Sequence, residues 1–386
     1  MNKILFGALA TSLVGATGFA SDTEWSELDR ELAAYNSAAP LTQDSTGPFV
    51  SGWLIGAITS DDTPDDNVND VLGTGVAASR INLQGDLGNN YSFKLGFDFT
   101  DTAELWKDQN GTDVNGDGIG DPAAAPSTAG LTDAYVNVGF SEGVSITVGG
   151  FRPTVLASSS VQRNHTLFIE RSYLGRQYAY RDAGAALNFG WDRINAQIAI
   201  MNGNSGSFDD LAYYLHADID LLGTGSDYEG GYAALEGTNL NIGVTYTDDG
   251  SDVTAINAAG GGATKAAGDS RDATQLAFYA TLATGGFTLW GEMVDQDDDV
   301  VVAGGMGTTP YSVGLGYMFG EQYEVAFRWD DYDTMDSITR YNFGLNYYVQ
   351  GHDIKWQLNF ASGSDDDLTN GNFENDVIAL AIAVGF

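Results

Sequence analysis

The chain of 386 residues contains no cysteine and only three histidines. Without cysteine, neither a disulfide framework nor a thiolate metal site exists. The histidines His165, His216 and His352 have neither the pairwise spacing of a zinc site nor a place in a recognisable nucleophile motif. We therefore expect no enzyme activity.

Basic residues are scarce, with 16 Lys and Arg against 53 Asp and Glu. Nucleic-acid phosphates need basic partners, so this balance argues against binding to nucleic acid. High negative charge also occurs in disordered chains. That interpretation is excluded because 43% of the residues are hydrophobic and 12% are aromatic.

Long apolar runs are confined to the N-terminus. Residues 1–20 have the features of a secretory signal peptide, with Lys3 before a mostly apolar stretch that ends in small residues. We place the cleavage before Ser21, with a cut after Ala16 as the alternative. Removing Lys3 leaves 15 basic residues, and the net charge of the mature chain becomes −38. No later stretch approaches the roughly twenty apolar residues of a membrane-spanning helix, so helical spans are excluded.

From Phe49 onward the periodicity is that of β-strands. In residues 93–99 and 323–330, for example, apolar side chains alternate with polar or small ones, which gives each strand one apolar face and one face suited to water. We count sixteen such segments, which begin near Phe49, Val76, Tyr91, Leu131, Val144, Ala183, Arg193, Leu211, Thr238, Thr274, Phe287, Tyr311, Gln322, Ile338, Asp353 and Val377.

The connections between these segments alternate between tight turns and long stretches. Tight turns occur at 88–90, 141–143, 190–192, 284–286, 320–322 and 350–352, and long connections at 59–75, 102–130, 152–181, 249–271, 296–309 and 361–374. This alternation is typical of a membrane barrel, which has short periplasmic turns and longer outside loops. We predict an all-β fold for residues 49–386, a closed antiparallel transmembrane β-barrel of about sixteen strands. The connection 223–237 is an exception, because it is long where a periplasmic turn is expected.

A soluble β-sandwich or β-helix is the alternative explanation of the periodicity. It does not explain the aromatic residues at strand ends, which fit the interfacial girdles of a membrane barrel: Tyr311, Phe319, Tyr323 and Tyr347. It also does not explain the last segment, where one apolar face runs from Ile378 to the terminal Phe386 and is opposed by alanine and glycine.

Residues 21–48 are predicted to form a short periplasmic helix and a linker before the barrel. Ser21 and Glu24 have the spacing of a capping box. Apolar residues recur at helical intervals, at Trp25, Leu28, Leu32 and Tyr35. The alternative is a frayed leader before the first strand.

Three stretches of the sequence resemble known outer-membrane proteins. The segment that ends in Phe386 is similar to the C-terminal signature that the outer-membrane assembly machinery reads. Residues 149–153 (GGFRP), 168–172 (FIERS) and 344–348 (GLNYY) resemble motifs of the phosphate-selective porin O/P family. The resemblance covers residues 49–386 and implies a sixteen-stranded trimeric porin. Members that select phosphate line the pore with arginines and lysines, and the net charge of −38 departs from that pattern. Phosphate selectivity is therefore not carried over.

Arginines are concentrated in the connection between the fifth and sixth segments. In sixteen-stranded porins a loop inserted at this place narrows the lumen, so the resemblance implies a pore constriction at Arg152, Arg163, His165, Glu170, Arg171, Arg176 and Arg181. An arginine cluster in a confined passage attracts anions and repels cations. The alternative is that these arginines hold the loop in place by pairing with wall carboxylates such as Glu170, Asp182 and Asp218. The two roles are compatible.

Strand parity identifies candidate residues of the pore wall. Their charges nearly balance, with Arg80, Lys94, Arg193, Arg328, Arg340 and Lys355 on one side and Asp86, Asp98, Asp218, Asp220, Glu292, Glu324 and Asp330 on the other. Most of the surplus acid then lies in loops. It is either solvated there, or concentrates cations at the pore mouth, or bridges to lipopolysaccharide through divalent ions.

One long connection has the spacing of a calcium loop. Asp113, Asn115, Asp117 and Asp121 place side-chain oxygens at positions 1, 3, 5 and 9 of an EF-hand-type loop. Position 12 is Ala124 rather than the bidentate Glu, so the pattern better resembles the shorter calcium loops of extracellular repeats. The alternative is a plain Asp/Gly surface loop, and we expect no other cofactor.

Together these features predict a porin of the Gram-negative outer membrane. It would allow passive diffusion of small hydrophilic solutes and ions through a water-filled barrel narrowed by the arginine-bearing loop. The expected partners are outer-membrane lipid, lipopolysaccharide and two further copies of the chain in a homotrimer. The alternative is a plugged structural or adhesive barrel that binds calcium or partners through its acidic loops.

Overall fold

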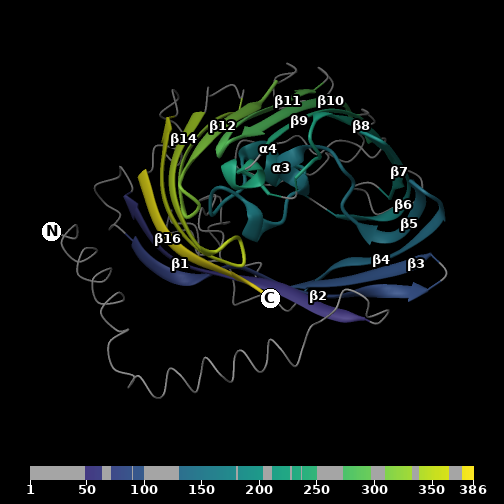
Figure 1. Ribbon diagram of the computed structural model, residues 1–386, viewed down its shortest axis with the longest axis horizontal. Helices are drawn as coiled ribbons and strands as arrows, with labels where there is room; N and C mark the ends of the chain where they lie inside the picture. Colours follow the sequence, from purple (N-terminus) through teal and green to yellow (C-terminus); the bar gives the residue numbers. More distant parts are fainter. Residues whose placement is uncertain are drawn as a thin grey trace, which may run out of the picture. The chain divides into compact units, whose positions relative to one another are not determined.

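Sixteen β-strands close into one antiparallel barrel, in which strands adjacent in sequence pair with one another and β1 pairs with β16 (Figure 1). The computed structural model describes residues 48–62, 71–88, 90–99, 130–179, 181–202, 211–226, 228–235, 237–249, 273–296, 309–332, 339–364 and 376–386. The predicted fold class is confirmed.

The strand bounds follow the predicted segments closely. The strands are β1 (Phe49–Asp62), β2 (Val71–Gly88), β3 (Tyr91–Asp98), β4 (Gly130–Ser141), β5 (Val144–Phe151), β6 (Asp182–Trp191), β7 (Ile194–Met201), β8 (Ala212–Leu222), β9 (Thr238–Asp249), β10 (Ala273–Thr284), β11 (Phe287–Gln296), β12 (Tyr311–Phe319), β13 (Tyr323–Asp331), β14 (Thr339–Gln350), β15 (Ile354–Ser364) and β16 (Asp376–Gly385). Only β2 begins well before its predicted start near Val76. Its first residues, VLGTG, have the composition of a loop but pair with β1, from Val71 opposite Asp61 onward.

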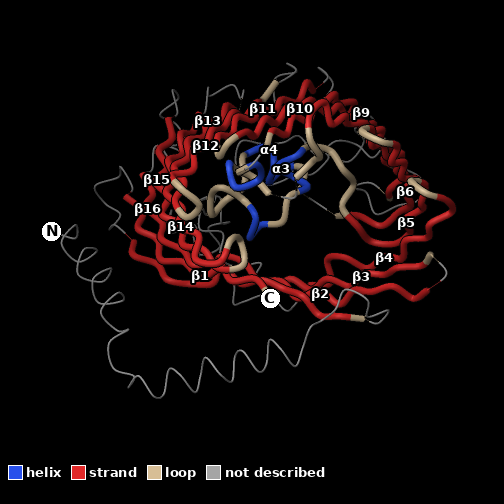
Figure 2. Tube along the Cα trace, viewed as in Figure 1, coloured by secondary structure: helices blue, strands red, loops and turns tan. Residues whose placement is uncertain are grey.

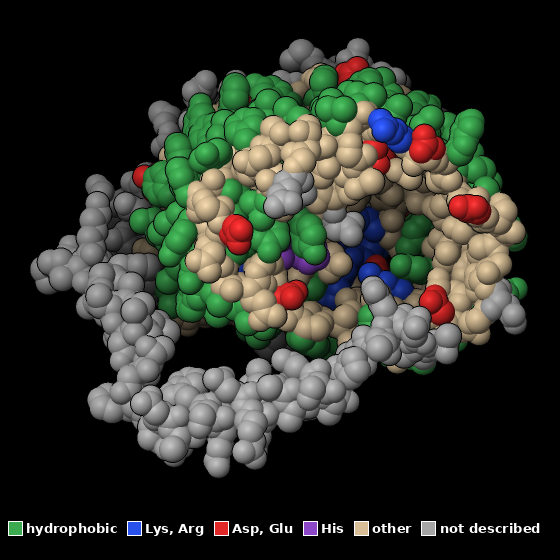
Figure 3. Space-filling model, in the orientation of Figure 1, with side chains coloured by type: hydrophobic (Ala, Val, Ile, Leu, Met, Phe, Trp, Pro, Cys, Tyr) green, Lys and Arg blue, Asp and Glu red, His purple; other side chains and the backbone are tan. Residues whose placement is uncertain are grey.

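Alternation along the strands separates the two faces of the barrel wall. In β12, Val313, Leu315 and Tyr317 are exposed on the outside, whereas Ser312 and Met318 are buried on the inside. Apolar side chains accordingly cover much of the visible outer surface of the ring (Figure 3). Outward aromatic rings also stack between neighbouring strands, as between Tyr323 of β13 and Tyr347 of β14, whose centroids lie 4.9 Å apart.

The two ends of the barrel differ. We call the end with the tight hairpins, after β2, β4, β6, β10, β12 and β14, the turn end, and the opposite end the loop end. The first and last strands meet at the turn end, where Gly52 and Phe386 exchange backbone hydrogen bonds of 2.8 and 2.9 Å. No helix within the described part of the chain is long and apolar enough to cross a membrane.

Of the connections that the structure describes, two fold into the lumen. The connection between β5 and β6, residues 152–181, contains α3 (Ala157–Ser160), η2 (Arg163–His165) and α4 (Tyr173–Gln177). We call it the inserted loop, and Figure 2 shows its helices inside the ring of strands. The connection between β8 and β9, residues 223–237, contains η3 (Gly231–Ala234) and enters from the turn end. This is the connection whose length was unexpected.

Several predictions fall on residues that the structure does not describe. These are the signal peptide at 1–20, the helix and linker over 21–47, and the calcium loop with Asp113, Asn115, Asp117 and Asp121. Among the described residues, no group of three or more His, Asp or Glu side chains is placed to hold a metal ion.

Candidate functional site

The inserted loop is fixed to the barrel wall by hydrogen bonds from side chains of many strands. A buried backbone must satisfy its N–H and C=O groups, and here the inner face of the wall supplies the partners. The contacts are Thr154 N–H to Gln197 (2.9 Å), Thr245 to the Val155 carbonyl (2.7 Å), Ser158 N–H to Glu292 (2.7 Å), Asn346 to the Leu167 carbonyl (2.9 Å), Ile169 N–H to Asn359 (2.7 Å), Arg328 to the Glu170 carbonyl (2.9 Å) and Lys355 to the Thr166 carbonyl (2.5 Å). Inward polar side chains of β11, β13, β14 and β15 thus supply five of these seven contacts.

Apolar packing reinforces these hydrogen bonds. Ile169 is fully buried against Trp53 and Ile55 of β1 and the inward alanines of β16. Leu156 and Leu174 join a second buried cluster with Tyr214 of β8. Because close-packed side chains leave little room for movement, the loop is a fixed part of the interior.

The remaining lumen contains a cavity of about 570 Å³ between the inserted loop and the wall of β1 to β7. Seven cationic side chains and two carboxylates are among the described residues that line it: Arg80, Lys94, Arg152, Arg163, Arg171, Arg176 and Arg181, with Asp98 and Asp133. We call it the basic cavity. In Figure 3, Lys and Arg side chains are visible inside the hollow of the ring.

Two wall cations and one cation of the inserted loop share one carboxylate in the basic cavity. Asp133 of β4 is almost fully buried and lies 2.5 Å from Arg181, 3.3 Å from Lys94 and 3.5 Å from Arg80. Arg80 also forms a two-pronged ion pair with Asp98. The two acids thus fix the directions of these three cations while neutralising only part of their charge.

Two arginines of the inserted loop, Arg152 and Arg171, are oriented by carbonyl groups. Arg152 donates to the carbonyl of Ser159, and Arg171 donates to the carbonyls of Ser158 and Val161. Carbonyl dipoles orient a guanidinium without cancelling its charge. Burial, and then Arg171, lower the pKa of Arg152 to about 8. Burial lowers the pKa of Arg171 to about 10. Both values lie above neutral pH, so both side chains remain cationic there.

The structure separates the predicted constriction residues into two groups. All five predicted arginines line the basic cavity, and Arg163 pairs with Glu170. Glu170 and His165 are not among its lining residues. His165 instead packs against Tyr228, with ring centroids 4.5 Å apart.

The predicted wall residues also differ in role. Arg80, Lys94 and Asp98 line the basic cavity, whereas Glu292, Arg328 and Lys355 hold the inserted loop. Arg340 lies in register with Asp330 near the loop end of β14. The prediction for Arg193 is corrected: β7 begins one residue later, and Arg193 lies in the turn before it and donates to the Leu221 carbonyl.

Asp218 lies in the part of the lumen nearer the turn end. It lines two further cavities of about 390 and 440 Å³ on the turn-end side, and Thr154 lines both of these and the basic cavity. Its carboxylate accepts hydrogen bonds from Asn195 at 3.0 Å and Asn241 at 2.9 Å. The three cavities therefore meet at Thr154, which marks a route from the basic cavity to the turn end.

Two acids of the site were not singled out from the sequence. Asp133 had a readable signal, because Asp133, Tyr135 and Asn137 alternate with the apolar Ala134 and Val136. Glu229 lies in the unexpected connection 223–237, and its contacts with the inserted loop depend on how two distant segments meet inside the barrel.

The fold and the partly filled lumen define the class: a sixteen-stranded barrel like the bacterial outer-membrane porins. OprB of Pseudomonas putida is similar with a TM-score of 0.57 at 11% identity, over 88% of this chain and 94% of that one. OmpF of Salmonella typhi, solved in complex with daunomycin, gives 0.54 at 12% identity, over 89% and 98%. The trimer form of OmpT from Vibrio cholerae gives 0.53 at 9% identity, over 88% and 100%. No family model and no curated protein matches the chain. The similarity is one of fold, and none of the three is named as a phosphate-selective porin.

Proposed function

We propose that the protein is an outer-membrane porin through which small hydrophilic solutes diffuse passively, and that its narrow part favours anions. The observation that carries the proposal is the basic cavity, where seven cations face two carboxylates among the described lining residues. No chemical step is involved. The barrel provides the passage, and the cavity charge biases which ions enter it.

The sign of the preference follows from local charge and not from net charge. The whole chain carries −37, but a surplus of positive charge lines the basic cavity. Charges that line a confined passage with low-dielectric walls act on a permeating ion more strongly than solvated charges elsewhere, because water screens the latter. We therefore propose that the loop acid has little effect on the ion preference.

The family, the oligomeric state and the contacts of the outer loops are finer parts of the same proposal. The GGFRP stretch ends β5 and opens the inserted loop, and FIERS lies in the middle of that loop. At Gly149, where φ is +130°, a Cβ would lie 2.2 Å from the Ala134 carbonyl oxygen. Both motifs thus contribute to the loop, and kinship with the phosphate-selective porin O/P family is proposed from the resemblance of these motifs. A homotrimer, contact with lipopolysaccharide and a calcium-binding outer loop are further parts of the proposal.

Planar-bilayer recording tests the function. We expect stable conductance from the folded protein and an anion-selective reversal potential in a KCl gradient. The double variant Arg152→Gln, Arg171→Gln removes two cavity charges and keeps donors for the loop carbonyls, so it should shift the potential toward cations. Arg193→Gln, in a turn outside the cavity, is the matched control. Absence of conductance from folded protein would overturn the proposal in favour of a plugged structural barrel.

A further inference from the structure

Glu229 of the connection 223–237 forms two hydrogen bonds with the inserted loop, one through its backbone N–H and one through its side chain. The N–H of Glu229 donates to the carbonyl of His165 at 3.1 Å. In return, the N–H of Leu167 donates to the Glu229 carboxylate at 2.9 Å. One residue of the connection thus satisfies two backbone groups of the loop, one on each side of Thr166.

The same connection is also tied to the barrel wall. The N–H of Gly231 donates to Glu324 of β13 at 2.6 Å, and the N–H of Gly286, in the turn between β10 and β11, donates to the Ala234 carbonyl at 3.0 Å. The approach is close, since a Cβ on Gly231 would lie 1.8 Å from the Gly286 carbonyl oxygen. The connection therefore has fixed contacts on both sides, with the loop and with the wall.

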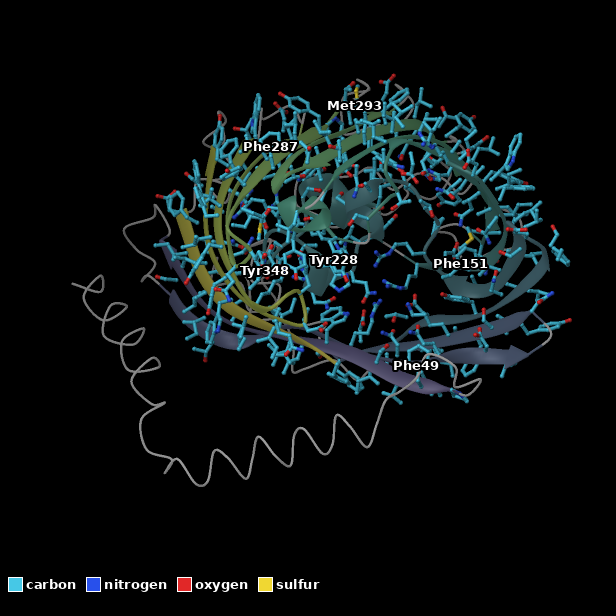
Figure 4. All side chains as sticks on the ribbon, viewed as in Figure 1. Phe49, Phe151, Tyr228, Phe287, Met293 and Tyr348 are labelled. Carbon is cyan, nitrogen blue, oxygen red and sulfur yellow. The ribbon has the colours of Figure 1, made fainter. Side chains whose placement is uncertain are left out.

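A cluster of aromatic rings surrounds this junction. Tyr228 stacks on His352 with centroids 4.7 Å apart, and Tyr232 packs against Tyr348 of β14 at 5.0 Å. Figure 4 shows Tyr228 and Tyr348 inside the ring of strands. Ring packing of this kind holds the connection inside the lumen.

Glu229 also brings negative charge close to the constriction. Its charge acts on Arg171 and opposes the lowering of the pKa of Arg171 by burial. Glu229 lines the 440 Å³ cavity together with Lys94 and Asp218. It is thus placed to affect both the position of the loop and the electrostatic field that a solute meets beside it.

We propose that residues 223–237 form a strap that holds the inserted loop from the turn end, and that Glu229 is its positioning residue. The Glu229 carboxylate fixes the loop backbone at Leu167 and offsets part of the charge of Arg171. This inference rests on the proposed pore function for its electrical consequence. The holding contact itself can be measured without current.

Two substitutions separate the two effects of Glu229. Glu229→Gln removes the charge and keeps an acceptor for the Leu167 N–H, so the reversal potential should shift toward anions with no rise in current fluctuations. Glu229→Ala removes both. It should give the same shift together with more frequent current fluctuations. Amide hydrogen exchange over residues 163–170 should become at least about tenfold faster, as expected for the loss of one hydrogen bond to a charged group. Glu142→Ala, an exposed residue of the turn between β4 and β5, is the control.

The outcomes distinguish failure of the strap from failure of the pore. If wild-type protein conducts and Glu229→Ala changes neither loop exchange nor reversal potential, the strap is wrong and the pore stands. If wild-type protein does not conduct but Glu229→Ala accelerates loop exchange, the strap stands and the proposed function is wrong. Should the alanine variant fail to fold, Glu229→Gln decides, because an unchanged reversal potential in a conducting channel would overturn the electrostatic role.

Discussion

Arg181, at the end of the inserted loop, lies 2.5 Å from Asp133 of β4, and this ion pair joins the loop to the barrel wall. Lys94 at 3.3 Å and Arg80 at 3.5 Å approach the same carboxylate. A single buried acid thus offsets part of the repulsion among three cations. The contact sets the geometry of the cavity as well as part of its charge.

Asp133→Asn should destabilise the barrel and make the pore more anion-selective. The amide cannot compensate the three cations, and losing a hydrogen bond to a charged group costs about 2 kcal/mol. Urea unfolding and the reversal potential measure the two effects. Asp98→Asn is the matched comparison and should cost less stability, because Asp98 is more exposed and pairs with Arg80 alone among the described ion pairs. Equal losses in the two variants would contradict the shared role of Asp133.

Thr245→Val should loosen the inserted loop without creating a cavity at position 245. Thr245 is fully buried and donates to the Val155 carbonyl at 2.7 Å. Valine has nearly the same shape but leaves that carbonyl without this donor, at a cost of about 1–3 kcal/mol. Unfolding midpoints and hydrogen exchange of the loop measure the change. Thr238→Val on the same strand is the control, because Thr238 bonds to Thr284 at the turn end. A loop equally protected in both variants would argue against the contact.

The sequence predicted the barrel better than its interior, for physical reasons. Alternation and turn composition are local, so all sixteen strands could be predicted, and only the loop-like start of β2 displaced a boundary. The inserted loop was expected from the resemblance to sixteen-stranded porins, at the long connection in which arginines gather. Its partners could not be predicted, since they depend on which inward side chains meet it across the barrel. Lys355, for example, was predicted as pore wall but is fully buried beneath the loop.

The contacts of the strap could not be predicted from the sequence either. The length of residues 223–237 was recognised as unusual, but neither the glycines nor the tyrosines of that stretch specify that it turns inward. Whether this stretch turns into the lumen depends on hydrogen-bond partners far away in sequence, namely His165, Leu167 and Glu324. Such long-range complementarity leaves no periodic signal in a single chain.

Stability should fall on acidification because of His352. Burial, and then Lys355 and His165, hold the pKa of this imidazole well below 6.5. The unfolded chain therefore binds a proton at pH values where the folded chain does not. This contribution to stability is present above about pH 6.5 and is lost as pH falls below it, by at most about 1.4 kcal/mol per pH unit. Urea unfolding at pH 7 and pH 5 should show a smaller difference in His352→Phe than in wild type. Parallel losses in both proteins would contradict the assignment.

The ion preference should also depend on pH through Glu229. Burial raises the pKa of this carboxyl, despite the hydrogen bond from Leu167. Glu229 therefore becomes neutral at a higher pH than a solvated Glu does, and the charge beside Arg171 becomes more positive as pH falls through that range. We expect the reversal potential of the wild type to move toward anions on mild acidification and to approach the value of Glu229→Gln, which should vary less over the same range. Other groups titrate in both proteins, so the difference between them isolates Glu229. If the two curves remain parallel from pH 8 to pH 4, the charge of Glu229 does not reach the permeating ion.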